Sequence, residues 1–558
     1  MSSQPVPVLI VGAGVSGLVL ATLLAKNDVP LRIVERLPSD GRTIGAKGSG
    51  VQPRTQELLE IMGIPYDELM ASGMGSLDMR FYAPPDGMTP AKTFPLAERL
   101  PVDPTVPYPE LVTVSQANLE SLLLRQLDKY GVKIEYSTTL QSLSQDQDTV
   151  TAVVKKDGLM ERIDAKWLVG ADGARGSSRK MLGVSYLGES RPGEKIFIAD
   201  VTVAGNFPCD VRLFRAFPTL YLSPQYWHAW GQFHTSAVGL LPLGGGDPTH
   251  FQLHLMGPEI DFDKVKTPQD VKDMFYTISN RKDIKIDQVR WMSTWTANVR
   301  LADRMQIGRC LLVGDAAHCH SPAGAQGMNT GLQDSFNLAW KLAAVTKGTA
   351  PSSLLSSYEA ERFPVIAEML QISNEMHSRL FAHAAPADGD PDPFHHPGST
   401  HQLGVNYRHS TVIFDERHTQ RGEAPAPYQR TGRLRAGDRA PDAPANGRRL
   451  FSLLGVQRHT ALLFCPKGED GGLLPRLKQA MNGAWDVVAI LPSGSKAIPD
   501  APYVFVDTDD VAFKAYEVGD DPLAFVVRPD GMIGAVVMSE EGIKRYVDLL
   551  GADAALKL

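Results

Sequence analysis

A glycine-rich turn near the N-terminus is the first group of residues whose spacing could do chemistry. It reads GAGVSG at 12–17, between an apolar run and a stretch at 15–26 with helical spacing. Gly12 would allow a tight turn, and Gly14 would let the backbone approach a pyrophosphate at the positive end of the helix. Glu35, at the end of the next apolar run, could accept hydrogen bonds from an adenosine ribose. The pattern predicts a dinucleotide site and leaves NAD and FAD both open.

Two further strings follow the ends of predicted strands. GADGAR at 170–175 follows an apolar run, although an Asp-Gly step after a strand is by itself usually a turn. In GRCLLVGDAAHCHSPAGAQGMN at 308–329, a strand ends at Asp315 and a long helix begins near Gly327. A carboxylate at a strand end can hold a polyol hydroxyl, and the N–H groups at a helix start can hold an anion. Together these parts fit a ribityl chain beside an electron-rich ring.

The elements that must position these motifs follow an α/β order. A strand at 6–11, a helix at 15–26 and a strand at 31–35 are the opening of a doubly wound sheet. Residues 196–300 alternate in the way that is typical of a β-rich domain. Further strands are expected around 150–173 and at 307–313, and helices at 116–130 and 327–348. Beyond the Pro-rich stretches at 384–400 and 421–447, strands and helices alternate again.

Composition restricts the function classes. The chain has 558 residues, which predicts about three to four domains, and a net charge of −7 that argues against a nucleic-acid partner. The four cysteines include no CxxC pair and favour a reducing compartment over a disulfide framework. The most apolar stretch, at 8–25, is too short and too interrupted for a membrane span. We therefore expect a cytoplasmic protein with no membrane or nucleic-acid partner.

The three motifs, in this order, resemble those of the FAD-dependent aromatic hydroxylases, the flavoprotein monooxygenases with the p-hydroxybenzoate hydroxylase fold. Length and C-terminal pattern are most similar to the phenol hydroxylase-like branch. The resemblance implies an α/β fold with a discontinuous, doubly wound, Rossmann-like FAD-binding domain, an inserted β-rich substrate domain and a thioredoxin-like C-terminal domain. Without a CxxC motif, this last domain is expected to serve packing or homodimer formation. The implied boundaries are 1–190 with 300–380 (FAD), 191–299 with part of 75–110 (substrate), 381–440 (linker and loops) and 441–558 (thioredoxin-like).

The resemblance also implies roles for individual residues. Asp315 would bind the ribityl and pyrophosphate region of FAD, and Pro322 would line the reactive face of the flavin. Backbone N–H groups at the start of the long helix would face the flavin N1–C2=O edge. Asp172 is similar to a residue linked to both FAD and NAD(P)H. The expected cofactor-binding residues are Gly12, Gly14, Ser16, Gly17, Glu35, Arg36, Lys47, Gln116, Asp172, Asp315, Gly327, Met328 and Asn329.

The implied activity is single-component monooxygenation of a phenolic or polycyclic aromatic substrate. NADPH or NADH would visit transiently to reduce FAD, and O2 would then form a C4a-hydroperoxyflavin that hydroxylates the ring. The position of an acid found in phenol hydroxylases is Ser49 here, so no carboxylate base is implied. Base candidates come from the β-rich region, where each could equally be a packing residue: Tyr221, Tyr226, His228 and His234. The residues named as catalytic are Pro322, His228 and Tyr221.

Three alternatives remain open: a flavin-dependent halogenase, an antibiotic-inactivating monooxygenase, and a non-catalytic FAD-binding carrier. The tryptophan spacings do not match a halogenase-type Trp-x-Trp-x-Ile string, whereas the antibiotic-inactivating enzymes share every motif. The intact GADGAR and PAGAQGMN strings favour retained catalysis. The cluster Cys310, His318, Cys319 and His320 lies inside the flavin motif, so we expect a cofactor loop there and no metal.

Overall fold

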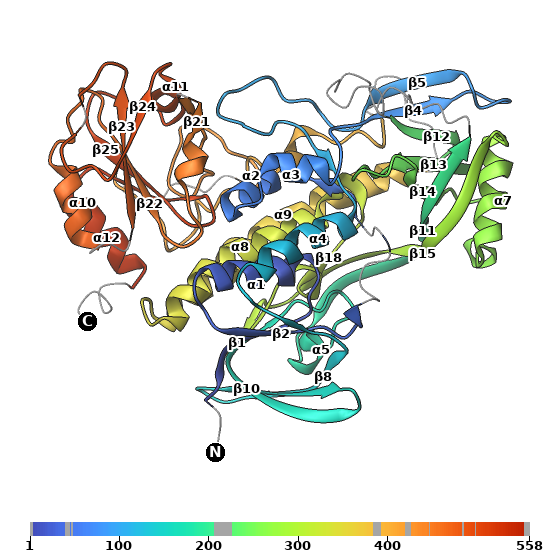
Figure 1. Ribbon diagram of the computed structural model, residues 1–558, viewed down its shortest axis with the longest axis horizontal. Coiled ribbons are helices and arrows are strands. Elements are labelled where there is room, and N and C mark those ends of the chain that lie inside the picture. Colours follow the sequence, from blue (N-terminus) through green and yellow to red (C-terminus); the bar gives the residue numbers. More distant parts are fainter. Residues whose placement is uncertain are drawn as a thin grey trace.

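The computed structural model describes residues 4–39, 45, 48–205, 226–382, 392–418, 426–445, 447–481, 485–496 and 498–551. Two of the predicted site residues, Lys47 and Tyr221, lie outside these ranges. Three large sheets organise the chain (Figure 1). Two long helices cross the middle of the molecule, between the C-terminal sheet at one end and the β-rich sheet at the other.

The first sheet brings the three sequence motifs to one edge. Its strand order is β16-β17-β10-β1-β2-β7, with β8 and β9 paired beside β10. Strands β2 (Leu31–Val34), β1 (Val6–Val11), β10 (Leu159–Gly170) and β17 (Cys310–Leu312) are parallel neighbours. The carboxyl ends of β1, β10 and β17, which carry the motifs, therefore meet at the edge where such folds bind ligands. The others are β7 (Ile134–Glu135), β8 (Thr138–Gln145), β9 (Val150–Lys156) and β16 (Gln306–Ile307).

Helices cover this sheet and carry the motifs onward. Helix α1 (Val15–Lys26) packs against both α4 (Gln116–Asp128) and α8 (Gly327–Thr346). Helix α9 (Ser356–Leu380), which the sequence analysis did not predict, packs along α8. These observations confirm the doubly wound α/β prediction. Shorter elements nearby are α2 (Pro53–Met62), α3 (Tyr66–Ala71), α5 (Ser178–Met181), β3 (Gly50–Val51) and β6 (Val112–Thr113).

The second sheet is antiparallel over most of its width and has the order β18-β15-β11-β14-β13-β12-β4-β5. The long strands β11 (Tyr186–Gly205) and β15 (Ile284–Ala302) pair with each other and connect it to the first sheet. The predicted domain boundaries at 190 and 300 thus fall inside continuous strands. The others are β4 (Asp78–Tyr82), β5 (Pro90–Pro95), β12 (Tyr226–Gln232), β13 (Ser236–Pro242), β14 (His250–Met256) and β18 (His318–Cys319).

Alternate residues of this second sheet pack on opposite faces. On the outer face, Trp230 and Leu253 share a core with Phe275 of α7 (Pro268–Ser279), a helix that the sequence analysis did not predict. On the inner face, Ala229 and Met256 belong to a separate cluster that includes Phe394. The inner face is the one turned toward α9, because that cluster also takes in residues from the end of this helix.

The third sheet forms the C-terminal domain, with the order β19-β26-β25-β22-β23-β24. Strands β22, β23 and β24 are parallel, whereas β25 is antiparallel to both β22 and β26. This order suits the predicted thioredoxin-like domain, an assignment that stays a proposal. Its elements are β19 (Phe414–Asp415), β22 (Thr460–Phe464), α10 (Leu473–Met481), β23 (Asp486–Pro492), β24 (Tyr503–Asp507), α11 (Val511–Ala515), β25 (Leu523–Val527), β26 (Ile533–Val537) and α12 (Glu540–Leu549).

The segment predicted as linker and loops is irregular where described, yet part of it is core. Among its described residues, the regular elements are β19 and a short turn of 3-10 helix at Gly398–His401. Tyr407 and Tyr428 are nevertheless buried in the same core as α1 and α8. The segment therefore fills the space between domains. The short strands β20 (Pro444–Ala445) and β21 (Arg448–Arg449) follow it.

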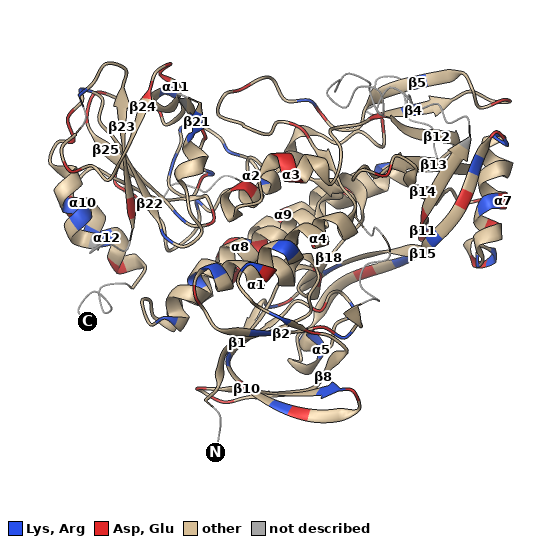
Figure 2. Ribbon diagram, in the orientation of Figure 1, with Lys and Arg blue, Asp and Glu red and all other residues tan. Residues whose placement is uncertain are grey.

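Basic and acidic residues are spread over all three domains (Figure 2). Within the described ranges, no helix is both long and apolar enough to cross a membrane. The same ranges contain no group of three or more His, Cys, Asp or Glu side chains arranged to hold a metal ion.

Candidate cofactor and substrate site

The glycine turn after β1 is packed at two positions and open at the third. Gly12 has a φ of +104°, and a Cβ there would lie 2.4 Å from the Ala171 carbonyl oxygen. A Cβ on Gly17 would lie 2.0 Å from the Gly12 carbonyl oxygen. A Cβ on Gly14 would meet no atom within 4 Å. Gly12 and Gly17 thus close the turn against the protein, and Gly14 leaves the space that a pyrophosphate would need.

Glu35 holds this turn from the end of β2. One of its carboxylate oxygens accepts a hydrogen bond from the Ala13 N–H at 2.9 Å, and the other accepts from the Leu37 N–H at 2.9 Å. The side chain is half-buried beside the glycine turn, and the neighbouring Arg36 is exposed. Each carboxylate oxygen can accept a second bond, so the position suits contact with a ribose.

The GADGAR string links the first sheet to the third motif. Asp172 accepts hydrogen bonds from the Ser178 N–H at 2.9 Å and hydroxyl at 3.0 Å, which fixes the start of α5. Arg179 then donates to the Ala174 and Ala316 carbonyl oxygens, each at 2.9 Å. These bonds give the motif a structural role, and its contact with a cofactor stays a prediction.

Asp315 lies at the carboxyl end of β17 with an exposed side chain. Before it, Gly314 has a φ of +58°, and a Cβ there would lie 2.5 Å from the Ser16 hydroxyl oxygen. A Cβ on Gly331 of α8 would lie 2.6 Å from the same oxygen. Ser16 therefore sits where α1, the Gly-Asp turn and α8 converge, and the Asp315 carboxylate projects beside this junction.

A buried ionic group that sequence reasoning missed supports the Gly-Asp turn. The Asp334 carboxylate accepts from the Gly314 N–H at 3.1 Å, and it pairs with His318 at 2.8 Å and Arg362 at 2.7 Å. Burial alone would raise the pKa of Asp334, but Arg362 and His318 hold it below its usual range. Asp334 lies on α8 and Arg362 on α9. They contact each other and the Gly-Asp turn only because these helices pack together, which the sequence pattern does not indicate.

The start of α8 carries the residues expected beside the flavin. Gly327 and Met328 are half-buried in its first turn. The Asn329 side chain is buried: it accepts from the Gln52 N–H at 2.9 Å and donates to the Gly50 carbonyl at 2.9 Å, so it fastens β3 to the helix. Helix α8 has 20 residues and no acidic side chain in its first turn, so its positive end is not neutralised locally.

Two further predicted residues border this region. Pro322 is exposed in the loop before α8, where it can face a bound ring. The Gln116 N–H donates to the Gly48 carbonyl at 3.1 Å, and its side-chain amide donates to Glu120 at 2.8 Å. A Cβ on Gly48 would meet no atom within 4 Å, as at Gly14. The residues present therefore fit FAD: two open glycine positions, a strand-end carboxylate and a helix start lie at one edge.

The inner face of the second sheet carries two buried polar atoms that sequence reasoning did not select. Neither the indole Nε1 of Trp227 nor the Nδ1 of His254 has a hydrogen-bond partner within the described part of the chain. The two rings lie 5.0 Å apart between centroids. Burial lowers the pKa of His254 to about 3, so its imidazole is neutral at ordinary pH. Buried polar groups are normally paired, so these two atoms are candidates for ligand contact.

The base candidates lie elsewhere. His228 is fully buried on the outer face, where its Nδ1 is hydrogen-bonded to the Tyr82 hydroxyl at 2.7 Å and its ring stacks with Tyr82 and Trp230. The Tyr226 ring on the same face lies under the Arg80 guanidinium, and His234 is exposed in the β12–β13 turn. This buried position, with its hydrogen bond to Tyr82, argues against His228 as a substrate-contacting base, and the role stays an untested prediction. Period-two alternation along β12, applied to the sequence, would have separated Trp227 from His228.

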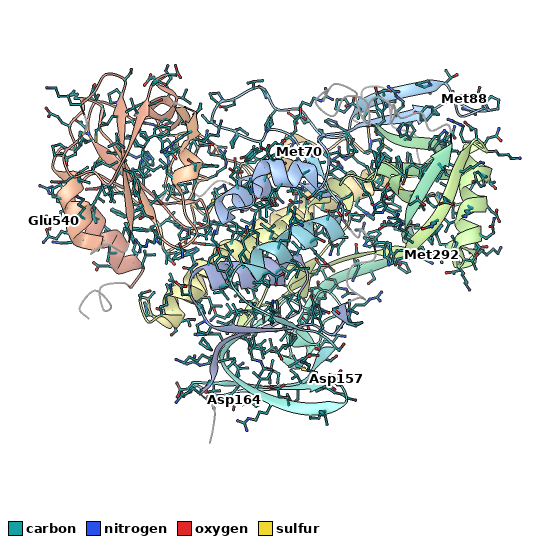
Figure 3. The ribbon with its side chains drawn as sticks, viewed as in Figure 1. Met70, Met88, Asp157, Asp164, Met292 and Glu540 are labelled. Atoms are coloured by element: carbon teal, nitrogen blue, oxygen red, sulfur yellow. The ribbon has the colours of Figure 1, made fainter. Side chains whose placement is uncertain are left out.

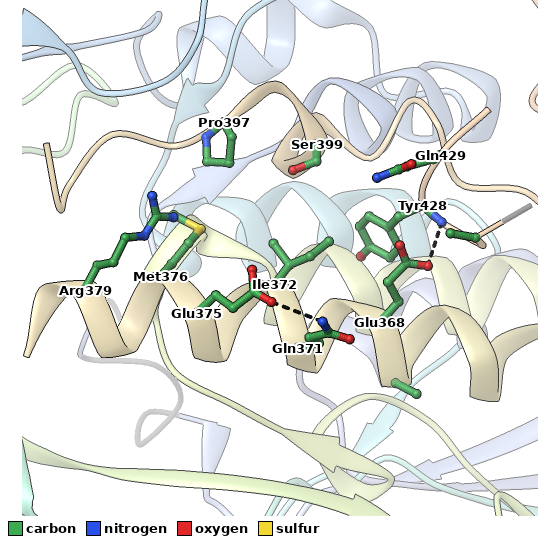
Figure 4. Close-up of a pocket in the computed structure, with 12 residues that line it drawn as sticks. Glu368, Gln371, Ile372, Glu375, Met376, Arg379, Pro397, Ser399, Tyr428 and Gln429 are labelled. Atoms are coloured by element: carbon green, nitrogen blue, oxygen red, sulfur yellow. Dashed lines mark hydrogen bonds between the residues drawn. The ribbon is translucent and has the colours of Figure 1, made fainter. Parts of the chain in front are cut away.

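A hollow of about 580 Å3 lies on the outer side of α9 (Figure 4). Glu368, Ile372, Glu375 and Met376 line it from the helix, and Tyr428 faces them from the irregular segment. Met376 also approaches the loop before α8, because a Cβ on Gly324 would lie 3.0 Å from its sulfur. The hollow lies behind the loop that precedes α8, and none of the cofactor-site residues described above lines it.

Fold and site together define a flavoprotein whose FAD site adjoins an aromatic sheet. Comparison with known proteins narrows the class. The model of the FAD binding domain family matches residues 5–373. A flavin-dependent monooxygenase of Mycobacteroides abscessus is 34% identical over 545 residues, covering 97% of this chain and 99% of that protein.

Two more relatives agree. The pentachlorophenol 4-monooxygenase of Sphingobium chlorophenolicum is 28% identical over 557 residues, covering 96% of this chain and 94% of that one. The structure of OxyS anhydrotetracycline hydroxylase from Streptomyces rimosus matches with a TM-score of 0.70 at 26% identity, covering 98% of this chain and 99% of that one. The chain belongs to the FAD binding domain family and is a FAD-dependent aromatic monooxygenase, which confirms the resemblance seen in its motifs.

Proposed function

We propose that this enzyme uses NADPH or NADH and O2 to hydroxylate an aromatic substrate that carries at least one ring oxygen substituent, phenolic or polycyclic. The observation that carries this proposal is the pair of unpartnered polar atoms, Trp227 Nε1 and His254 Nδ1, on a face that also carries a cluster of aromatic and aliphatic side chains. The relatives' names, with pentachlorophenol and anhydrotetracycline, support such a substrate class.

FAD supplies the redox chemistry when it is bound. In this proposal the backbone of 12–17 holds the pyrophosphate, Glu35 the ribose and Asp315 the ribityl region. The N–H groups of 327–329 hold the flavin edge and Pro322 lines its face, as in the family that the motifs resemble. Ser16, Arg36, Lys47, Gln116 and Asp172 remain proposed further contacts.

The chain's own residues orient the substrate and exclude water. The Trp227 indole N–H would donate to a carbonyl or hydroxyl oxygen of the substrate, and the neutral His254 would exchange a hydrogen bond with a second oxygen or with a hydroxyl on the same ring. Aromatic side chains around them, including Trp291 and Trp295, provide a water-poor surface. His254 thus positions the substrate and carries no charge at working pH.

The test is product formation from purified, FAD-loaded enzyme with NADPH or NADH under 18O2. The compounds are phenol, pentachlorophenol and anhydrotetracycline, and both oxygen incorporation and hydrogen peroxide are measured. Accelerated nicotinamide oxidation with one labelled oxygen in the product supports the proposal. Reduction that yields only peroxide with every compound, or no reduction by either nicotinamide, contradicts it and favours the FAD-binding carrier.

An antibiotic-inactivating role is a variant of the same reaction. It differs only in the substrate, and the anhydrotetracycline arm above reports on a polycyclic ring system of that kind. The homodimer and the cytoplasmic location also stay proposals. Light scattering of the purified protein tests the first. The three described cysteines, Cys310, Cys319 and Cys465, are buried free thiols, which fits the reducing compartment proposed.

A further inference from the structure

Three side chains from separate elements form a hydrogen-bonded chain beside the flavin loop, defined here as residues 320–326. The Ser321 hydroxyl lies 2.8 Å from Nδ1 of His377 on α9. Nε2 of His377 lies 2.5 Å from the carboxylate of Glu194 on β11. Ser321 and His377 are fully buried, whereas the Glu194 side chain is 31% exposed. This hydrogen-bonded series of side chains thus runs from solvent at the second sheet, called the substrate sheet from here on, to the backbone of the flavin loop.

The donors and acceptors in this chain fit a single arrangement. The ionised Glu194 carboxylate can only accept, so His377 carries its proton on Nε2 and donates it to Glu194. Nδ1 is then an acceptor, and the Ser321 hydroxyl donates to it. The Ser321 oxygen in turn accepts from the Ala323 N–H at 3.2 Å. Each hydrogen bond thus orients the group that makes the next one. The last bond, from the Ala323 N–H to Ser321, holds the backbone just after Pro322.

Local structure aims Glu194 at this point. The pairing of β11 with β15 shifts register between Arg191 and Lys195, a bulge that turns Glu194 toward α9. Arg191 flanks the carboxylate at 3.6 Å and donates to Asn374 of α9 at 3.0 Å. A bulge redirects one side chain without ending the strand, so Glu194 can contact His377 of α9 while β11 continues in the sheet.

Other contacts show that this face of α9 supports the flavin loop. The Ser373 hydroxyl donates to the Ser321 and Ala323 carbonyl oxygens, both at 3.3 Å. Met376 lies against Gly324 from the hollow of Figure 4. Of these described contacts with the flavin loop, the His377 link is the one that continues beyond the helix, to Glu194 of the substrate sheet.

We propose that Glu194 and His377 are positioning residues for hydroxylation: through Ser321 they hold the flavin loop in register with the substrate sheet, so that reduction of O2 is coupled to substrate oxygenation. This inference rests on the proposed function. A loop held loosely would leave Pro322 and the start of α8 misplaced relative to the substrate. More of the NADPH oxidised would then yield hydrogen peroxide in place of hydroxylated product.

The hydrogen bond between Ser321 and His377 should weaken at low pH. Burial lowers the pKa of His377, and the carboxylate of Glu194 partly offsets this. The charged groups that face the imidazole are Glu194 and Arg191 from β11, and it otherwise meets Ser321 and the rings of Trp295 and Phe381. Below its pKa, His377 is protonated at Nδ1 and can no longer accept from Ser321. Coupling should therefore fall as pH decreases through the pKa of His377, which lies below its ordinary value of 6.5.

Three variants test the proposal on the FAD-loaded enzyme: Ser321→Ala, His377→Leu and Glu194→Gln. The measurements are the fraction of NADPH oxidation that yields hydroxylated product, substrate KM, and both from pH 5 to 8. We expect product yield per NADPH to fall about fivefold to tenfold in the first two variants, the effect of one hydrogen bond, with KM unchanged. In Glu194→Gln the acid limb should move to lower pH, because the carboxylate that raises the His377 pKa is gone.

Ser357→Ala is the matched control, since Ser357 of α9 is a buried serine like Ser321, and among the described residues its hydroxyl donates to the Leu354 carbonyl just before the start of the same helix. It should keep wild-type coupling. Hydrogen exchange of the 318–330 peptide in the apoprotein gives a readout without activity, and should be faster in Ser321→Ala and His377→Leu. Wild-type coupling and exchange in His377→Leu, or a loss that appears in KM alone, overturns the proposal. If wild-type enzyme forms no product, the proposed function fails, and hydrogen exchange still decides whether the chain holds the loop.

Discussion

Two buried polar regions of the molecule differ in how completely their groups are paired. One is the ionic seam, defined as Lys341, Glu361, Arg528 and Asp530, where α8 and α9 meet the C-terminal domain. The other is the inner face of the substrate sheet around Trp227 and His254. The four seam residues and His254 are buried, and Trp227 is partly buried. In the seam every charge has a partner, whereas on the inner face the Trp227 Nε1 and His254 Nδ1 atoms have none among the described residues.

The ionic seam shows what a buried group needs in order to stay charged. Glu361 pairs with Lys341 at 2.7 Å and with Arg528 at 2.7 Å, and it accepts further bonds from Ser410 at 2.7 Å and Asn337 at 2.6 Å. Burial alone would raise the pKa of Glu361, but Arg528 and Lys341 hold it well below its usual range. Burial also lowers the pKa of Lys341 to about 8. The charges of the seam are thus paired within the protein itself, and the seam needs no ligand to connect the domains.

The inner face lacks such partners, and this difference separates scaffold from site. A buried polar atom without a hydrogen bond costs roughly 1–3 kcal/mol, so a ligand that supplied the missing partner at Trp227 and His254 would gain affinity. The seam should therefore respond to mutation with lost stability. The inner face should respond with lost substrate affinity.

The largest effect is expected in the seam. Glu361→Gln would leave two buried cations, Arg528 and Lys341, with Asp530 as the one remaining carboxylate of the seam, and loss of one partner of a buried pair typically costs about 3–5 kcal/mol of unfolding free energy. Urea denaturation of the FAD-loaded protein measures it. Glu540→Gln removes an exposed pair with Lys544 on α12 and should change little (Figure 3). Equal effects of the two variants would show that the seam is not what joins the domains.

The glycine turn offers the same contrast within one motif. Gly14→Ala adds a methyl group to open space, so the apoprotein should fold normally while the pyrophosphate is kept at a distance. We expect FAD affinity to fall roughly tenfold or more, which is about 1.4 kcal/mol, by titration of the apoprotein with FAD. Gly17→Ala would instead place its Cβ 2.0 Å from a backbone oxygen and should impair folding itself. A Gly14→Ala protein that retains wild-type FAD affinity would contradict this assignment.

The contrast also explains what the sequence could predict. Local features could be predicted, because each motif is contiguous with the strand or helix that carries it. These features are the glycine turn, Glu35, Asp315 and the helix that begins within PAGAQGMN. The ionic seam was not predicted, since Arg528 and its partner Glu361 are distant in sequence. The same holds for Asp334 with Arg362 and for Ser321 with His377. Such pairs depend on how α9 packs, and the sequence analysis did not predict α9.

A pair of histidines on opposite faces of one sheet sharpens the comparison further. His228→Leu would leave the buried Tyr82 hydroxyl without this partner and should cost about 1–3 kcal/mol of stability, with substrate KM unchanged. His254→Leu removes an unpartnered atom and should leave stability nearly constant while raising substrate KM about fivefold, the effect of one hydrogen bond. Thermal denaturation and steady-state kinetics measure the two effects. If His228→Leu raised KM and His254→Leu did not, the assignment of faces would be reversed.

The smallest effect concerns pH. His228, His254 and His459 have pKa values lowered to about 3 by burial, below their unfolded value near 6.5. Between these values the unfolded chain binds protons that the folded chain does not, so stability falls as pH decreases from 6.5. Each histidine should contribute about 1 kcal/mol of loss between pH 6.5 and 5.5. His254→Leu should therefore reduce the acid sensitivity of urea denaturation by that amount. An unchanged slope would mean that His254 titrates freely in the folded protein, and the inner face would then be open to water and unsuited to protect an oxygenating flavin.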